Sequence, residues 1–194
     1  MCEKCKKEIE KIEQVRQIKY KSKYYDEHIY MFKYNFIRDK ILAYKFNDKA
    51  YYYKTFVGIL LNNKKMCEIL TSYDIIVPVP IHNKRRKERR YNQTELIAKE
   101  IAKNIDGLEY ANILEKNKNT VPQSTLNKKD RIKNSVNVYN LKNISNTKIN
   151  YKKHIKNILI FDDIYTTGST SNECAKILRK LEPKSIGILT IAKD

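Results

Sequence analysis

Two adjacent carboxylates, Asp162 and Asp163, are the residues whose types and spacing most clearly suggest chemistry in this chain. They follow the apolar run 158–161 and precede a turn of hydroxyl residues around one glycine: Thr166, Thr167, Gly168, Ser169 and Thr170. The two carboxylates can accept hydrogen bonds from vicinal hydroxyls such as those of a ribose. The turn, placed before a helical segment, offers backbone N–H groups and hydroxyls to a phosphate. The stretch therefore predicts a site for a 5-phosphorylated ribose. The alternative is an ordinary strand, turn and helix cap, since Ser and Thr cap helices routinely.

A second group of candidate residues lies in the basic run 84–90, which contains Arg85 and Arg89. The run follows the apolar segment 74–80, so we expect it at the carboxyl end of a strand, where α/β sheets bind ligands. Cations there suit a pyrophosphate, because guanidinium groups bind phosphate oxygens bidentately. Two other interpretations stay open: a nucleic-acid patch without sequence specificity, or a solvated charged loop.

Cys2 and Cys5 form a C-x-x-C pair, which is half of the ligand set of a zinc knuckle. Zinc takes four ligands, and no second pair is visible; His28 is the only imidazole nearby. We therefore expect the zinc site to be incomplete in this chain. Cys67 and Cys174 fall in helical patterns and are predicted to be buried thiols.

The elements that must position these residues alternate between strands and helices. Buried strands are predicted at 74–80, 158–161 and 185–192, and helices at 36–46, 50–71, 171–181 and in a segment ending near 105. Residues 6–20 have the spacing of a short amphipathic helix, residues 24–34 are predicted to be extended or irregular, and residues 108–156 show little periodicity. This order of strands and helices implies right-handed crossovers and a parallel sheet.

The composition bounds the class of protein. With 40 basic and 22 acidic residues the formal charge is +18, which favours polyanionic partners such as nucleic acid or phosphorylated metabolites. A generally lysine-rich surface is the competing explanation. An apolar fraction of 41% is enough for a core. No apolar run approaches the roughly 18 residues that a membrane helix needs, and no signal peptide is recognisable, so we expect no membrane insertion and a cytoplasmic location.

The stretch 157–170 resembles the signature of type I phosphoribosyltransferases, in which apolar positions lead to an acidic pair and a Thr-Thr-Gly-x-Thr turn. Further motifs, in the same order along the chain, resemble the ComF (competence protein F) family of phosphoribosyltransferase-like proteins. They are the Cys2–Cys5 pair, Tyr34…Arg38…Lys45-Phe46…Asp48, Pro78-Val79-Pro80, Arg85…Arg89…Asn92-Gln93, and Thr120…Gln123…Leu126…Arg131…Asn134. The sequence departs from the family at Arg90, where the family usually has Gly, and in lacking the first half of the zinc module.

The resemblance implies an α/β protein with the type I phosphoribosyltransferase fold. We expect a central, mostly parallel sheet flanked by helices, with a small hood region and an N-terminal appendage that is helical and carries the half zinc knuckle. The corresponding division of the chain is an appendage at residues 1–30 and a phosphoribosyltransferase-like domain at residues 31–194.

The resemblance also implies a ligand, phosphoribosyl pyrophosphate with Mg²⁺, and a connection to DNA uptake during natural transformation. Asp162 and Asp163 would then serve catalysis by holding the ribose hydroxyls, the turn 166–170 would bind the 5-phosphate, and Arg85 and Arg89 would bind the pyrophosphate. Arg131 would lie on a flexible loop that closes over the site. The motifs imply no particular acceptor. The alternative is a non-catalytic module that senses the metabolite, or that binds single-stranded DNA or competence proteins through its basic surface.

Overall fold

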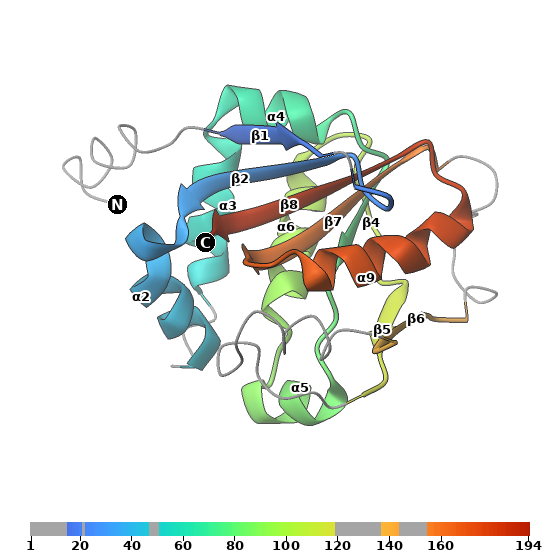
Figure 1. The fold of residues 1–194 in the computed structure, drawn as a ribbon. Helices are drawn as coiled ribbons and strands as arrows, with labels where there is room; N and C mark the ends of the chain where they lie inside the picture. The colour runs from blue at the N-terminus through green and yellow to red at the C-terminus, as the bar shows by residue number, and fades with distance from the viewer. Residues whose placement is uncertain (1–14, 21, 47–50, 119–136, 144–154) are drawn as a thin grey trace.

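A computed structural model of the chain describes residues 15–20, 22–46, 51–118, 137–143 and 155–194. They form an α/β fold around a six-stranded sheet with the strand order β1-β2-β8-β7-β3-β4. Every neighbouring pair in this sheet is parallel except β1 and β2. A separate antiparallel ladder, formed by β5 and β6, lies beyond the edge of the main sheet (Figure 1). The predicted class, with a mostly parallel central sheet flanked by helices, is confirmed, and this architecture is compatible with a type I phosphoribosyltransferase fold.

The centre of the sheet is made of apolar runs that are buried on both faces, as expected for parallel strands. Ile158, Ile160 and Phe161 in β7 are inaccessible to solvent, as are their neighbours in β8. The strands are β1 (Arg16–Lys19), β2 (Glu27–Lys33), β3 (Ile75–Pro78), β4 (Glu109–Tyr110), β5 (Leu114–Lys116), β6 (Tyr139–Leu141), β7 (Asn157–Tyr165) and β8 (Ser185–Lys193). The three buried strands expected from the sequence correspond to β3, β7 and β8, and β2 confirms extended structure within 24–34.

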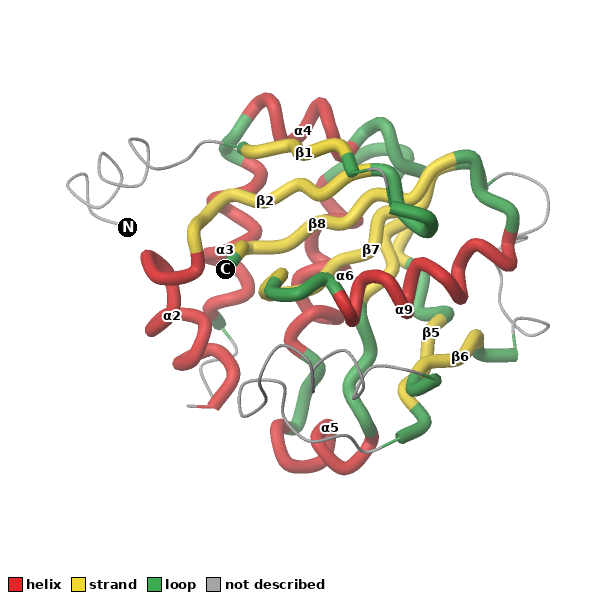
Figure 2. The backbone as a smooth tube through the Cα atoms, in the orientation of Figure 1, coloured by secondary structure: helices red, strands yellow, loops and turns green. Residues whose placement is uncertain are grey.

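Helices cover both faces of the sheet, in two layers (Figure 2). On one face, α9 (Ser169–Leu178) packs against Ile158, Ile160, Ile186 and Ile188. The other face is covered by four helices: α2 (Tyr34–Phe46), α3 (Tyr52–Leu61), α4 (Lys64–Leu70) and α6 (Gln93–Asn104). The short helix α5 (Asn83–Arg89) projects at one end of the sheet. The sheet is thereby sandwiched, and its strand ends are left for the connecting loops.

Several local predictions are wrong in detail. Residues 16–19 form the edge strand β1 rather than the end of a helix, because they pair with β2. The single helix expected over 50–71 is two helices, since Asn63 interrupts it and caps α4 by accepting from the Met66 N–H at 3.0 Å. Part of the basic run, expected as a loop, is helical.

Parts of the predicted organisation concern residues outside the described ranges. Cys2, Cys5 and most of the 6–20 segment lie there, as does Arg131, so the zinc appendage and the flexible loop stay predictions. So does the hood. Residues 16–19 and 27–30 of the predicted appendage contribute β1 and the first half of β2 to the central sheet. His28 is buried within β2, where its Nε2 lies 2.8 Å from the Thr190 hydroxyl. None of the described helices is long and apolar enough to cross a membrane.

Candidate functional site

The turn after β7 has the geometry that an anion-binding loop requires. β7 continues through both carboxylates to Tyr165, which pairs with Lys193 of β8, and α9 begins at Ser169. Gly168 between them has φ +74°, a left-handed conformation that favours glycine. It also lies against the Tyr165 ring, which a Cβ at this position would overlap. Glycine is thus required here twice, by its backbone angle and by the close approach.

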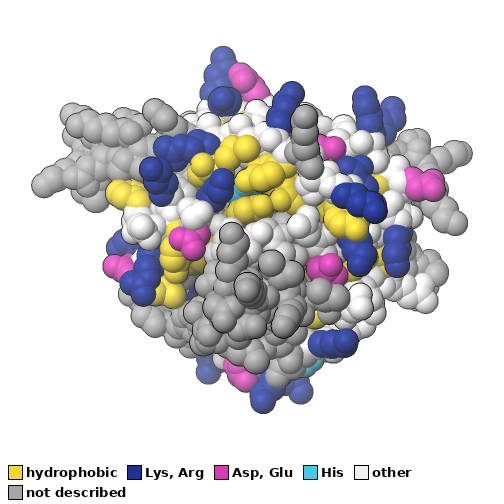
Figure 3. Space-filling view, in the orientation of Figure 1, with side chains coloured by type: hydrophobic (Ala, Val, Ile, Leu, Met, Phe, Trp, Pro, Cys, Tyr) yellow, Lys and Arg dark blue, Asp and Glu magenta, His cyan; other side chains and the backbone are white. Residues whose placement is uncertain are grey.

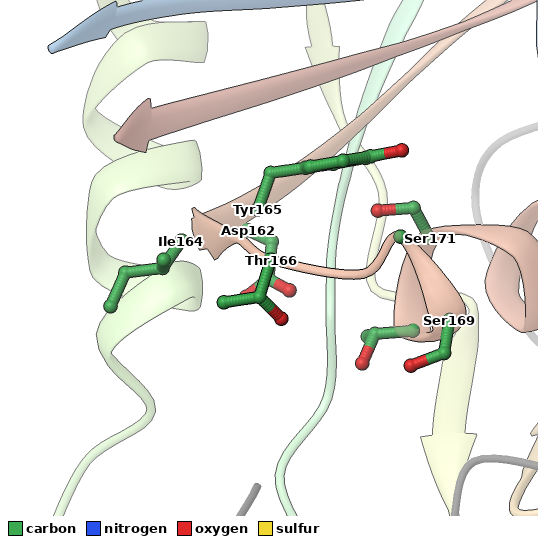
Figure 4. Close-up of a pocket in the computed structure, with 8 residues that line it drawn as sticks. Asp162, Ile164, Tyr165, Thr166, Ser169 and Ser171 are labelled. Carbon is green, nitrogen blue, oxygen red and sulfur yellow. The ribbon is translucent and has the colours of Figure 1, made fainter. Parts of the chain in front are cut away.

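A hollow that is open to solvent lies at this turn. Its walls come from the end of β7 and from the first turn of α9, and the hydroxyls of Thr166 and Ser169 lie at it together with the Asp162 carboxylate (Figure 4). The lining residues are Asp162, Ile164, Tyr165, Thr166, Gly168, Ser169, Thr170 and Ser171. The hydroxyl of Thr167 lies 3.0 Å from that of Ser169 and orders the turn. The hollow therefore combines one carboxylate, several hydroxyls and a helix N-terminus.

The two carboxylates differ in their surroundings. Asp162 points to the hollow and accepts a hydrogen bond from the Asp163 backbone N–H at 2.9 Å. Burial raises the pKa of Asp162 to about 7, and repulsion by Asp163 adds to the shift, while Lys45 and Lys116 oppose it. Asp163 instead forms an ion pair with Lys45 of α2, with 2.6 Å between Nζ and Oδ2. At neutral pH Asp163 is thus paired with the Lys45 ammonium, whereas Asp162 is close to its pKa.

The basic segment 83–93 brings Arg89 within electrostatic reach of the carboxylate pair. Arg89, in the last turn of α5, donates to the Gln93 side chain at 3.3 Å. Burial lowers the pKa of Arg89, and the negative charge of Asp163 acts in the opposite direction, which places Arg89 within electrostatic reach of that carboxylate. Arg90 follows with φ 63°. An arginine in a left-handed conformation therefore stands at the position where the family pattern leads us to expect Gly.

Lys116, at the end of β5, is a further charged residue of this region. Its Nζ lies 5.4 Å from the centre of the Tyr139 ring, across the small ladder from β6. Burial lowers the pKa of Lys116 to about 8, the nearby Arg85 lowers it further, and Asp162 opposes the shift. The charges of Arg85 and Lys116 therefore act on each other beside Asp162. A lysine with a pKa lowered by burial and by a neighbouring cation is a candidate functional-site residue.

The sequence and the structure agree on part of this site. The predicted residues Asp162, Asp163 and 166–170 share one strand end, and Arg85 and Arg89 lie in α5, the helix that follows the neighbouring strand β3. Lys45 and Lys116 are not predicted as site residues. Lys45 belongs to the motif Tyr34…Arg38…Lys45-Phe46…Asp48, but that motif assigns it no role, and Lys116 stands in a stretch without periodicity. Within the described ranges, no group of three or more His, Cys, Asp or Glu side chains could hold a metal ion.

These features define an α/β protein with an acidic pair and a phosphate-type turn at the carboxyl edge of its parallel sheet. No family model matches the chain. It is 31% identical over 156 residues to "Competence protein F" of Haemophilus influenzae, an alignment that covers 79% of this chain and 66% of that protein. It is 26% identical over 167 residues to "Competence protein ComFC" of Streptococcus pneumoniae, covering 86% and 68%. The chain belongs to the ComF family, and it spans about two thirds of the length of these curated relatives.

Proposed function

We propose that this protein binds phosphoribosyl pyrophosphate together with Mg²⁺ at the hollow after β7. The observation that carries the proposal is the left-handed Gly168 between the acidic pair and the N-terminus of α9, with hydroxyl side chains around it. Backbone N–H groups at a helix N-terminus and neighbouring hydroxyls suit a phosphate dianion. A carboxylate pair on the preceding strand suits the ribose hydroxyls attached to that phosphate.

Each part of the ligand has a matching part of the site. The turn 166–170 binds the 5-phosphate, and Asp162 and Asp163 accept hydrogen bonds from the ribose hydroxyls. Arg85 and Arg89 neutralise the pyrophosphate, and Lys116 adds a third cation at the same end of the sheet. This arrangement places cations where the negative charge of a departing pyrophosphate grows, which is the usual electrostatic contribution to such a transfer.

The residues present are compatible with Mg²⁺ that arrives with the ligand. The donors at the hollow are carboxylate and hydroxyl oxygens, which Mg²⁺ prefers, but the described residues do not form a dedicated metal cage. Mg²⁺ commonly keeps several waters and is held through substrate phosphates and one or two carboxylates. Here Asp162 or Asp163 would supply that carboxylate contact through water, and the ion would supply charge neutralisation at the pyrophosphate oxygens.

If a transfer takes place, the C1–oxygen bond to pyrophosphate breaks while a bond from an acceptor to C1 forms. Hydrogen bonds from the diol to the carboxylates stabilise the positive charge that develops on the ribose ring, and the pyrophosphate leaves with its charge neutralised by the arginines. The chain then acts as a phosphoribosyltransferase. Its acceptor can be sought by measuring pyrophosphate release in a screen of purine, pyrimidine and amine compounds.

Isothermal titration of the protein with phosphoribosyl pyrophosphate and Mg²⁺ tests the binding step. We expect saturable heat with the wild type and its loss in a variant with Asp162→Asn and Asp163→Asn. Equal heat from the variant, or none from the wild type, would show that the acidic pair is not a ligand site. Ribose 5-phosphate and pyrophosphate, titrated separately, would then show which half of the ligand the hollow recognises.

A second candidate function is suggested by the charge of the chain. With a formal charge of +18, and Lys and Arg side chains spread over the face seen in Figure 3, the surface favours nucleic acid. The names of the relatives point to competence, so single-stranded DNA taken up during transformation, or a competence protein, would be the partner. Affinity for single-stranded DNA should then fall steeply from low to physiological salt. Undetectable binding at low salt would exclude the DNA version of this function.

A further inference from the structure

The last turn of α2 is attached to the segment between α5 and α6, at Tyr91 and Gln93. Tyr44 is fully buried, and its hydroxyl donates to the Gln93 carbonyl at 2.8 Å. In return the Tyr91 hydroxyl donates to the Tyr44 carbonyl at 2.9 Å. The Tyr44 ring also packs edge-on against Phe56 of α3. These contacts set the position of this helix end relative to the sheet without any help from charged groups.

Lys45 follows directly in the chain, so the same contacts determine where its side chain begins. Its ammonium reaches across to Asp163 at the end of β7, with 2.6 Å between Nζ and Oδ2. Only 19% of the Lys45 side chain and 14% of the Asp163 side chain are accessible to solvent. An ion pair that is this well shielded is screened much less by salt than one on the open surface.

A purely structural role would be to attach α2 to the sheet. That role is already filled, since Ile37, Ile41 and Tyr44 pack α2 against the core. The Tyr44 hydroxyl also donates to the Gln93 carbonyl. The ion pair instead uses one of the two carboxylates that a ribose diol would need. Its location next to Asp162, which lines the hollow, connects Lys45 to the candidate site rather than to the packing of the helix.

We infer that Lys45 is a positioning residue of the ligand site: it holds Asp163 by one oxygen and so directs the other toward a ribose hydroxyl. It also reduces the negative charge of the acidic pair, which would otherwise repel an anionic ligand. The inference rests on the proposed function and extends it to Lys45 of α2, a residue to which the sequence alone assigns no role. A diol-bearing phosphate is therefore recognised jointly by β7 and α2.

The charged and titratable groups around the pair come from several elements. Lys45 contacts Asp163 from α2, and the charge of Asp163 also acts on the Tyr44 hydroxyl of α2 and on Arg89 of α5. Lys116 acts on Asp162 from β5. Lys45 lies within ion-pair distance of Asp163, with 2.6 Å between Nζ and Oδ2, which makes it the group to change first.

The test compares Lys45→Met with Lys40→Met in titrations with phosphoribosyl pyrophosphate and Mg²⁺. Lys40 lies on the same helix and is exposed, so its removal deletes the same charge away from the site. We expect Lys45→Met to weaken binding by about tenfold or more, as for loss of a hydrogen bond to a charged group. Lys40→Met should change it by less than about twofold, because solvent and salt screen it. Equal affinity of Lys45→Met and wild type would overturn the inference.

A double-mutant cycle separates positioning from a general effect of charge or folding. If Lys45 acts through Asp163, Lys45→Met should cause little further loss in an Asp163→Asn background. The same tenfold loss in both backgrounds would contradict this mechanism. Lys45→Arg, which keeps the charge, should recover most of the affinity, and it serves in place of Lys45→Met if that variant does not fold; an affinity as low as that of the uncharged variant would count against the inference.

A second measurement needs no ligand. In a carboxyl NMR titration of the free protein, Lys45→Met should raise the pKa of Asp162 above about 7, because Lys45 lowers it, whereas Lys40→Met should not. An unchanged titration of Asp162 would overturn the electrostatic part of the inference. If the wild type does not bind phosphoribosyl pyrophosphate, the proposed function fails, and the NMR titration still shows whether Lys45 controls the acidic pair.

Discussion

The two sides of the candidate site are assembled in different ways. On one side, the acidic pair, the hydroxyl turn and the start of α9 come from the single stretch 157–170. On the other, the cations come from three separate elements: Lys45 from α2, Arg85 and Arg89 from α5, and Lys116 from β5. The continuous side is positioned by local backbone geometry, and the composite side depends on buried tyrosines and on strand pairing. Changes on the continuous side should therefore act directly on ligand binding, and changes on the composite side should act partly through stability.

The largest expected effect is at Gly168. Gly168→Ala adds a Cβ that overlaps Tyr165 and strains a φ of +74°, which should cost about 1–3 kcal/mol and abolish measurable binding of phosphoribosyl pyrophosphate. Gly58→Ala is the matched control, because a Cβ there meets nothing within 4 Å; it should stabilise α3 by about 1 kcal/mol. Thermal unfolding and titration calorimetry measure both. Normal binding by Gly168→Ala would mean that the turn does not need this conformation.

Asp162 should give the continuous side a pH dependence of opposite sign to that of Lys116 on the composite side, which loses its charge as the pH rises through about 8. With its pKa raised to about 7, the ionised acceptor form becomes dominant as the pH rises, so affinity should increase between pH 6 and pH 8. Asp162→Asn should be about tenfold weaker at pH 8, for loss of a charged acceptor, and should lose this part of the pH dependence. Ionisation of the ligand itself is common to both proteins and cancels in the comparison.

The raised pKa of Asp162 also predicts how the folding stability changes with pH. The pKa of this carboxyl group is higher in the folded protein than the ordinary 3.8, so the folded state binds the proton more tightly. Below pH 3.8 the group is protonated in both the folded and the unfolded state, and the free energy of unfolding is at its highest. Between pH 3.8 and about 7 only the unfolded state loses the proton, so the free energy of unfolding falls. Above about pH 7 both states are ionised, and it stays constant. Wild type should therefore lose stability relative to Asp162→Asn between pH 3.8 and about 7, as measured by denaturant unfolding. A difference between the two proteins that does not vary with pH would contradict the assignment.

Tyr44 tests how the composite side is held together. Tyr44→Phe keeps the buried ring but removes the hydroxyl that donates to the Gln93 carbonyl at 2.8 Å, which should cost about 1–2 kcal/mol of folding stability. Because the same contact positions Lys45 and the segment that follows α5, binding of phosphoribosyl pyrophosphate should weaken as well, but by less than in Gly168→Ala. Tyr51→Phe, at an exposed ring (59% accessible), should change neither quantity. A loss of stability with fully retained affinity would show that the α2 end and the site are independent.

The smallest effect is expected at Arg90. Arg90→Gly relieves the strain of φ 63° at an exposed position and should stabilise the fold by no more than about 1 kcal/mol, because glycine also increases the entropy of the unfolded chain. Glu182→Gly provides a comparison at another exposed left-handed residue, with φ 55°. Unfolding midpoints of the two variants should shift in the same direction. Destabilisation by Arg90→Gly alone would indicate that the arginine side chain makes a contact that the loop needs.

The sequence predicts the central elements well and their limits less well. The apolar run indicates a strand only at 158–161, but β7 continues to Tyr165 because β8 remains paired with it as far as Lys193. In the same way, the spacing of Ile12, Val15 and Ile18 suggests a helix, while residues 16–19 take the strand that β2 offers them. Pairing with a distant segment decided both outcomes, and a local pattern does not contain that information.

The sequence by itself determined the acidic pair, the glycine turn and the helix after it, because these residues are contiguous and their geometry is set by backbone angles and local hydrogen bonding. It also indicated that two arginines would face them, since parallel strands bring their carboxyl ends to one edge. Only the tertiary structure decided that Lys45 forms an ion pair with Asp163 and that the charge of Lys116 acts on Asp162. Both lysines reach the site through contacts between segments far apart in the chain. Lys45 belongs to a motif of the family resemblance, but the sequence around neither lysine indicates which carboxylate it would meet.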